Sequence, residues 1–94
     1  MRYYMNIIPT ELTISPKNVL NVLEGAGNIQ NIVPPLEDFH ILYFTNKDDF
    51  IFFISGGNII LVGELPHSIS VGPIYGLAFN PELNKYQIVG HLTP

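Results

Sequence analysis

Three histidines, His40, His67 and His91, are the residues of this chain with the widest range of chemistry. Imidazole nitrogens bind divalent metals and transfer protons near neutral pH. A three-histidine metal site would need these side chains to converge, and their spacing along the sequence does not force them together. Single histidines in strands are more often half-buried packing residues, so the sequence favours a packing role for each. A small metal- or ligand-binding β-barrel is the alternative.

Acidic and hydroxyl side chains are the next candidates for chemistry. The adjacent pairs Glu37-Asp38 and Asp48-Asp49 could hold a hard cation or act as general acid and base. Acidic pairs in turns are usually solvated, however, and no partner base is indicated. Ser68 and Ser70 lie near His67, but no orienting acid follows them, and an activated serine nucleophile requires one. We therefore expect no enzymatic activity, no cofactor and no bound metal.

Two glycine-rich segments, Gly25-Ala26-Gly27-Asn28 and Ser55-Gly56-Gly57, are candidates for phosphate binding. A phosphate-binding loop follows a strand and opens a helix, so that backbone N–H groups and the helix N-terminus face the anion. Neither segment has that context. Both are interpreted as turns.

The composition indicates one small domain over residues 1–94. A chain of this length buries roughly 60 to 65% of the surface that it exposes when unfolded. Its apolar fraction is 47%, but its charged fraction of 13% is about half of what is usual for soluble domains. With so few charges to cover the outside, we expect exposed apolar patches that a protein partner or a second copy covers.

The charge pattern argues against nucleic acids and membranes as partners. The net charge is −4, and the four basic residues are scattered singly, so there is no cationic stripe for a phosphate backbone or an anionic lipid surface. The apolar runs are far shorter than the ~20 residues of a spanning helix. The chain has no cysteine and its N-terminus lacks the apolar core of a secretory signal. We therefore expect an intracellular protein of the cytoplasm or nucleus.

The N-terminal segment, residues 1–35, is expected to hold one strand and one helix. Residues 1–9 are apolar up to a proline and predict a short strand at a sheet edge. Ser15 is a good helix N-cap, Pro16 suits the first turn, and Gly25 stands where a helix ends. The sequence therefore predicts a helix from Pro16 to Glu24, followed by a break over residues 31–35.

Residues 36–94 are predicted to form an antiparallel β-meander of blade-like, small sandwich or half-barrel shape. The connecting segments 46–49, 55–57 and 80–84 have hairpin lengths and turn residues. The runs 50–54 and 59–62 show no polar alternation, which predicts a central hairpin covered on both faces. The fold class is thus mainly β with one short N-terminal helix. The predicted strands are 39–45, 50–54, 58–62, 74–79 and 86–91.

The hairpin spanning residues 72–90 is the best specified element. The Asn80 side-chain oxygen can accept from backbone N–H groups two or three residues on, and Pro81 presets φ for the first corner of the turn. Gly76 in mid-strand predicts the close approach of a large neighbour. The rings expected to pack around this hairpin are Tyr75, Phe79 and Tyr86.

The same hairpin carries a family resemblance. Tyr75-Gly76-Leu77-Ala78-Phe79-Asn80-Pro81, followed after four residues by Tyr86-Gln87-Ile88-Val89, resembles the signature of plant F-box-associated domains, which are kelch-like propeller modules. The similarity extends over about residues 39–91. Asn80 and Gln87 stand where the family has aspartate and lysine, and Val62 stands where it has tryptophan.

The resemblance implies a surface that captures substrates for a cullin ubiquitin ligase. Propellers have 4 to 8 blades and kelch repeats run about 50 residues, so this chain would supply one truncated blade. We therefore expect a noncatalytic protein–protein interaction module. The alternatives are a standalone homodimeric β domain of the viral or phage accessory type and the small ligand-binding barrel considered above.

Overall fold

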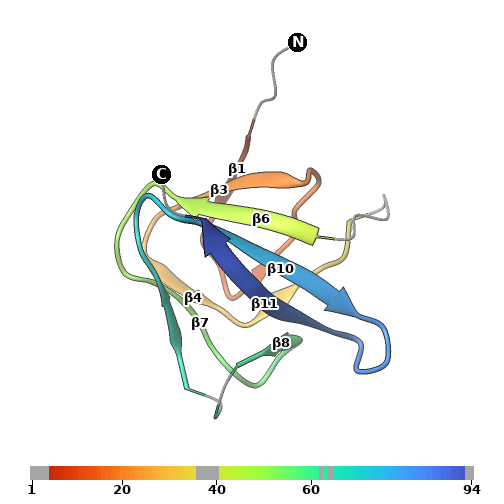
Figure 1. Ribbon diagram of the computed structural model, residues 1–94. Helices are drawn as coiled ribbons and strands as arrows, with labels where there is room; N and C mark the ends of the chain where they lie inside the picture. The colour runs from red at the N-terminus through yellow and green to blue at the C-terminus, as the bar shows by residue number, and fades with distance from the viewer. Residues whose placement is uncertain (1–4, 36–40, 62, 64, 93–94) are drawn as a thin grey trace.

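The described part of the chain consists of short β-strands and the turns and loops that connect them (Figure 1). The computed structural model describes residues 5–35, 41–61, 63 and 65–92, and of residues 91 and 92 it describes the backbone. No α-helix occurs among these residues, so they contain no helix that is long and apolar enough to cross a membrane. In chain order the strands are β1 (Asn6–Pro9), β2 (Thr13–Ile14), β3 (Leu20–Glu24), β4 (Gly27–Ile29), β5 (Asn31–Ile32), β6 (Ile41–Asn46), β7 (Ile51–Phe53), β8 (Ile59–Ile60), β9 (His67–Ile69), β10 (Ile74–Asn80) and β11 (Lys85–Leu92).

Successive passes of the chain stack on one another with their strands parallel. The first pass contains β1 and β2, the second β3 to β5, and the third β6 to β8. Strand β3 pairs in parallel with β1 and β6, β5 pairs in parallel with β2, and β4 pairs in parallel with β7. Figure 1 shows β1, β3 and β6 next to one another in this order. Such stacking is the principle of solenoid proteins, in which each pass contacts only its neighbours.

Antiparallel strands complete the structure after the third pass. The hairpin β10–β11 joins the first sheet through β6, and the two-residue β8 pairs in parallel with β11. The resulting six-stranded sheet has the order β1-β3-β6-β10-β11-β8. On another side of the molecule, β9 pairs antiparallel with β7.

Apolar side chains of neighbouring passes stack in the interior of the coil, as we call the stack of three passes. Ile14 lies over Ile32 in one sheet and Ile29 over Phe53 in another, and all four are buried. Phe53 also meets Phe44 edge to face, with ring centroids 6.3 Å apart. Parallel pairing in register therefore turns the alternation within each short strand into one continuous core.

Two asparagines are buried with this core and hold the passes together. The Asn21 side-chain amide donates to the carbonyls of Asn18 and Tyr43, at 3.0 and 3.2 Å. The Asn46 amide donates to the Ile69 carbonyl at 2.6 Å. The two side-chain amides thus donate to backbone carbonyls far along the chain, Tyr43 and Ile69, which offsets part of the cost of burying them. The side-chain oxygens of Asn21 and Asn46 are buried without a hydrogen-bond partner among the described residues.

The predicted helix from Pro16 to Glu24 is wrong. Residues Leu20–Glu24 form β3, which lies between β1 and β6 and pairs with both. A helix of nine residues would have been marginal on its own, whereas two neighbouring strands satisfy the backbone on both sides. Gly25, expected as a helix terminus, instead turns the chain after β3 with φ 88°, and its N–H donates to the Asp48 carboxylate at 2.7 Å.

The expectation of one antiparallel meander is also wrong, although the mainly β class is confirmed. The segments 46–49 and 55–57 connect strands of different sheets, because β7 pairs with β4 and β9 while β8 pairs with β11. Strand β7 is not covered on both faces: Ile51 and Phe53 are buried, Phe52 is half-buried, and the preceding Phe50 is 74% exposed. The strands predicted at 74–79 and 86–91 are confirmed as β10 and β11, and an edge strand is confirmed at β1. Residues 39 and 40, the start of another predicted strand, lie outside the described residues.

Candidate functional site

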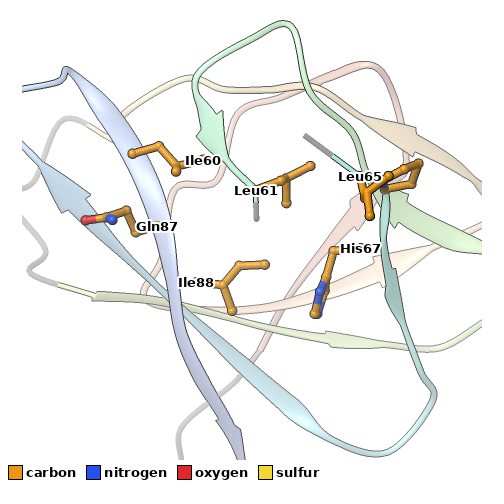
Figure 2. A pocket seen from close by; sticks show the side chains of 7 residues that line it. Ile60, Leu61, Leu65, His67, Gln87 and Ile88 are labelled. Carbon is orange, nitrogen blue, oxygen red and sulfur yellow. The ribbon is translucent and has the colours of Figure 1, made fainter. Parts of the chain in front are cut away.

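An apolar groove lies between β11 and the segment that links β8 to β9. Its volume is about 510 Å³. Figure 2 shows Ile88 extending from β11 toward His67 on the opposite wall, with Leu61 and Leu65 along the top. The described residues that line the groove are Ile60, Leu61, Leu65, Pro66, His67, Gln87 and Ile88.

The β8 wall of the groove is held in place by Asn58. The Asn58 side chain accepts from the Ile32 N–H at 2.7 Å and donates to the Ile32 carbonyl at 2.6 Å. Its own carbonyl accepts from the Tyr86 N–H at 2.7 Å. One residue therefore ties β8 both to the second pass of the coil and to β11.

The edge of β11 beside the groove is only partly paired. Strand β8 covers Tyr86 and Gln87, with Ile59 and Ile60 as their register partners. From Ile88 onward, no described strand pairs with this side of β11. Backbone groups of β11 thus border the groove at the point where the intramolecular strand ends.

Two polar side chains, His67 and Gln87, interrupt the apolar lining. The His67 ring packs edge to face against Tyr75, with centroids 5.9 Å apart, and is half-buried. The Tyr75 hydroxyl in turn accepts from the Ser70 N–H at 3.0 Å. Gln87 is exposed. An apolar lining with two polar groups suits an apolar ligand whose orientation is set by a few hydrogen bonds.

The predicted hairpin residues lie in β10, β11 and the turn between them. As expected, the Asn80 side-chain oxygen accepts from the N–H groups of Glu82 and Leu83, at 3.1 and 3.3 Å. Phe79 and Tyr86 pack edge to face, with centroids 5.1 Å apart. Burial raises the pKa of the Tyr86 hydroxyl above its ordinary value. Pro81 is exposed in the turn, so its part in the hairpin is to shape the backbone.

Gly76 allows a close approach, but the neighbours are not the expected rings. A Cβ built at Gly76 would lie 3.3 Å from Val89 and 3.4 Å from both Ile41 and Tyr43. The register of β10 and β11 shifts next to this glycine, so that Val89 forms a β-bulge. The bulge and the neighbouring strand β6 therefore explain the missing side chain.

The structure does not bring the predicted chemical candidates together in the part of the chain that it describes. Of the three histidines, His67 alone has a described side chain; His40 and the side chain of His91 lie outside. No group of three histidine, aspartate or glutamate side chains suited to a metal occurs among the described residues. Glu37 and Asp38 lie outside them too.

The other acidic pair is used for structure. Asp48 accepts the Gly25 N–H, and Asp49 is exposed. Beside them Lys47 pairs with Glu24 at 3.0 Å on the surface, and the hydrogen bond to Glu24 raises the pKa of Lys47. Both Ser68 and Ser70 are exposed, and the hydrogen bond near His67 uses the backbone N–H of Ser70. The contacts of Asp48 and Lys47 join the turn after β6 to the end of β3, and the exposed Lys47–Glu24 pair adds little stability.

Sequence reasoning missed the groove itself. Leu61, Leu65 and Ile88 come from segments that the sequence assigns to different elements, and the strand pairing that unites them was not expected. One signal was available in the sequence, the apolar pair Leu65-Pro66 between two predicted strands. In the structure Leu65 is 69% exposed, and exposed apolar side chains of this kind often mark binding sites.

Comparison of the chain with protein-family models, with curated proteins and with solved structures finds no match. The likeness of residues 39–91 to F-box-associated domains therefore stays a prediction that depends on the sequence pattern alone.

Proposed function

We propose that this protein is a noncatalytic protein-binding module that takes up an extended, apolar segment of a partner in the groove beside β11. The observation that carries the proposal is the position of the groove, directly against a sheet edge that is unpaired after Gln87 among the described strands.

Strand addition explains how such a site would work. An extended peptide that joins a sheet edge gains backbone hydrogen bonds, while its alternate side chains enter pockets that confer specificity. Strand β8 already pairs with β11 in this way over Ile59 and Ile60. A partner segment placed in line with β8 would continue that pairing from Ile88.

The lining of the groove sets what the segment would look like. Its volume of about 510 Å³ lies within the range of ligand pockets, and Leu61, Leu65 and Ile88 favour apolar side chains. The β-bulge at Val89 limits regular pairing along this edge, because bulges bend and twist a strand. Affinity would then come mainly from side chains in the groove, and His67 and Gln87 would select among apolar segments.

The resemblance to F-box-associated domains supports the same kind of function. In that version the bound segment belongs to a substrate of a ubiquitin ligase, and this chain is the recognising part of an adaptor.

A selection from random peptides tests the proposal. We expect a displayed library of random heptapeptides to yield binders with apolar residues at alternate positions. Leu65→Asp should weaken the binding of a selected peptide by about ten- to a hundredfold, because burying a leucine side chain contributes about 1.5–3 kcal/mol. Fluorescence anisotropy with the purified protein measures the affinity.

The matched control is Leu83→Asp. Leu83 is exposed to a similar degree, 56%, but lies in the turn between β10 and β11, away from the groove. The control should bind like the wild type. A selection without enrichment, or equal losses in the two variants, would show that the groove is not a peptide site.

A further inference from the structure

The outer edge of β1 is a second edge of the six-stranded sheet along which no described strand pairs. Strand β1 pairs with β3 on one side and has no neighbour among the described strands on the other. It lies at the opposite end of the sheet from β8 and the groove. This edge is therefore separate from the site proposed above.

The backbone of Ile7 faces the free side of β1. The Thr10 N–H donates to the Glu24 carbonyl at 2.8 Å, so the backbone groups of Thr10 point toward β3. Backbone direction alternates along a strand, and Ile8 and Asn6 therefore also face β3. The N–H and the carbonyl of Ile7 are left pointing outward, away from the sheet.

The outer face of β1 is apolar where polar residues would be usual. Ile8 is buried, whereas Met5, Ile7 and Pro9 form an exposed row, with Ile7 61% exposed. Alternation normally places polar side chains on the solvent side of such a strand. An apolar row on an open edge is the pattern that leads to pairing with another chain.

Other free edges in the described structure carry the usual protection. Strands β2, β5 and β8 have two residues each, and β4 and β9 have three. Very short edge strands are one way in which proteins prevent unwanted pairing, and a β-bulge such as that in β11 is another. Strand β1 is longer, at four residues, and has no bulge; its one protection is Pro9 at its end, which lacks an N–H, so Ile7 is left able to pair.

We propose that two copies of this chain associate through β1, in an antiparallel pair centred on Ile7. With a two-fold axis at this position, each Ile7 N–H donates to the Ile7 carbonyl of the other copy, as in a hydrogen-bonded antiparallel pair. The two Ile7 side chains lie next to each other, and Met5 of each copy lies opposite Pro9 of the other. The six-stranded sheet then continues across the dimer.

Charge repulsion between two copies is weakest at this edge. The chain has a net charge of −4, so two copies repel each other over much of their surfaces. Residues 5–10 carry no charged side chain. The row Met5, Ile7 and Pro9 is also its own complement under a two-fold axis, as an isologous contact requires.

The solution mass tests the dimer. Wild-type protein should approach about 21 kDa, twice the 10.5 kDa of one chain, as the concentration rises. Ile7→Lys should stay at the mass of one chain, since it places two ammonium groups side by side on an otherwise intact exposed position. Val89→Lys is the matched control, because Val89 is 57% exposed on β11, and it should dimerise like the wild type. Light scattering after size exclusion measures the three masses.

A single introduced cysteine tests the register. The natural chain has no cysteine, so Ile7→Cys can form a disulfide only between copies. A hydrogen-bonded antiparallel pair places the Cα atoms about 5.5 Å apart, within the range of disulfides. Under mild oxidation Ile7→Cys should become a covalent dimer, and Val89→Cys should react far more slowly. A wild-type mass that stays at one chain up to about 1 mM, an Ile7→Lys variant that still dimerises, or equal crosslinking of the two cysteine variants would overturn the proposal.

Discussion

Asn58 offers the sharpest test of how the passes of the coil are joined. Strands β5 and β8 occupy successive passes but are not hydrogen-bonded to each other as strands. The Asn58 side chain instead engages both backbone groups of Ile32, at 2.7 and 2.6 Å. The side-chain amide thus takes the place of one rung of a parallel ladder. Ile32 is only 1% exposed, so solvent has little access to its backbone N–H and carbonyl.

Asn58→Ala should lower the free energy of unfolding by about 2–4 kcal/mol. Each of the two hydrogen bonds contributes about 0.5–1.5 kcal/mol net, and a buried group left without a partner adds about 1–3 kcal/mol where water does not replace the bond. Asn58 is half-buried, so water restores part of the loss. A domain of this size has about 5–14 kcal/mol in total. The variant should therefore fold with reduced stability.

Asn58→Asp should make the loss depend on pH. A carboxylate at this position accepts from the Ile32 N–H but repels the Ile32 carbonyl oxygen, which raises the pKa of the new carboxyl in the folded state. A folded-state pKa above the unfolded value of about 4 means that stability is highest at low pH and falls as pH rises through the folded pKa. Relative to the wild type, the deficit should be small at about pH 3.5, where the acid donates like the amide, and larger at neutral pH.

Urea denaturation at the two pH values measures both effects. Asn28→Ala and Asn28→Asp are the controls, because Asn28 is exposed in β4 and no described hydrogen bond uses its side chain. They should change stability by less than about 0.5 kcal/mol. The reasoning fails if Asn58→Ala behaves like the Asn28 controls, or if the deficit of Asn58→Asp shrinks as pH rises.

Three further outcomes are expected, each measured by urea or thermal denaturation. Gly57→Ala should lower the free energy of unfolding by more than about 2 kcal/mol, since its methyl group would overlap the backbone of the preceding pass. Gly76→Ala should lower it by no more than about 1 kcal/mol, because its methyl group meets only the ends of side chains. Similar losses in the two variants would contradict this packing. Phe53→Asp should prevent folding, but Phe52→Asp should cost about 1–2 kcal/mol, as Phe52 is half-buried on the outer face of β7; a folded Phe53→Asp would refute the assignment of faces. Burial raises the pKa of the Tyr86 hydroxyl, so the stability that the neutral hydroxyl provides is complete below pH 10 and is lost as pH rises through the raised pKa. Tyr86→Phe should therefore flatten the fall in stability at alkaline pH, and an unchanged slope would contradict the burial of this hydroxyl.

The predictions that succeeded depend on local chemistry. The Asn80-Pro81 turn has its own side-chain hydrogen bonds, and the strands on either side of it pair with each other at once. Contacts of this kind join residues a few positions apart, so their residue types are visible side by side in the sequence.

The predictions that failed concern strands whose partners are a full pass away. The paired residues Asn6 and Asn21 are separated by a different number of residues than the pair Leu20 and Tyr43. The sequence therefore has no regular repeat from which the stacked passes could be predicted. Without that period, Ser15 and Pro16 look like the start of a helix, and Gly56 and Gly57 like a hairpin turn. The groove was missed for the same reason, since its walls come from β8, β9 and β11.

The sequence by itself thus determined the mainly β class, the hairpin β10–β11 and the small number of charged side chains. Only the tertiary structure decided that the passes stack in parallel, that β8 stops after Ile60 and leaves a groove beside β11, and that Ile7 faces an open edge. The physical reason is that a short strand satisfies its backbone through whichever strand comes alongside. That choice depends on the packing of the whole core and is not encoded in any one segment.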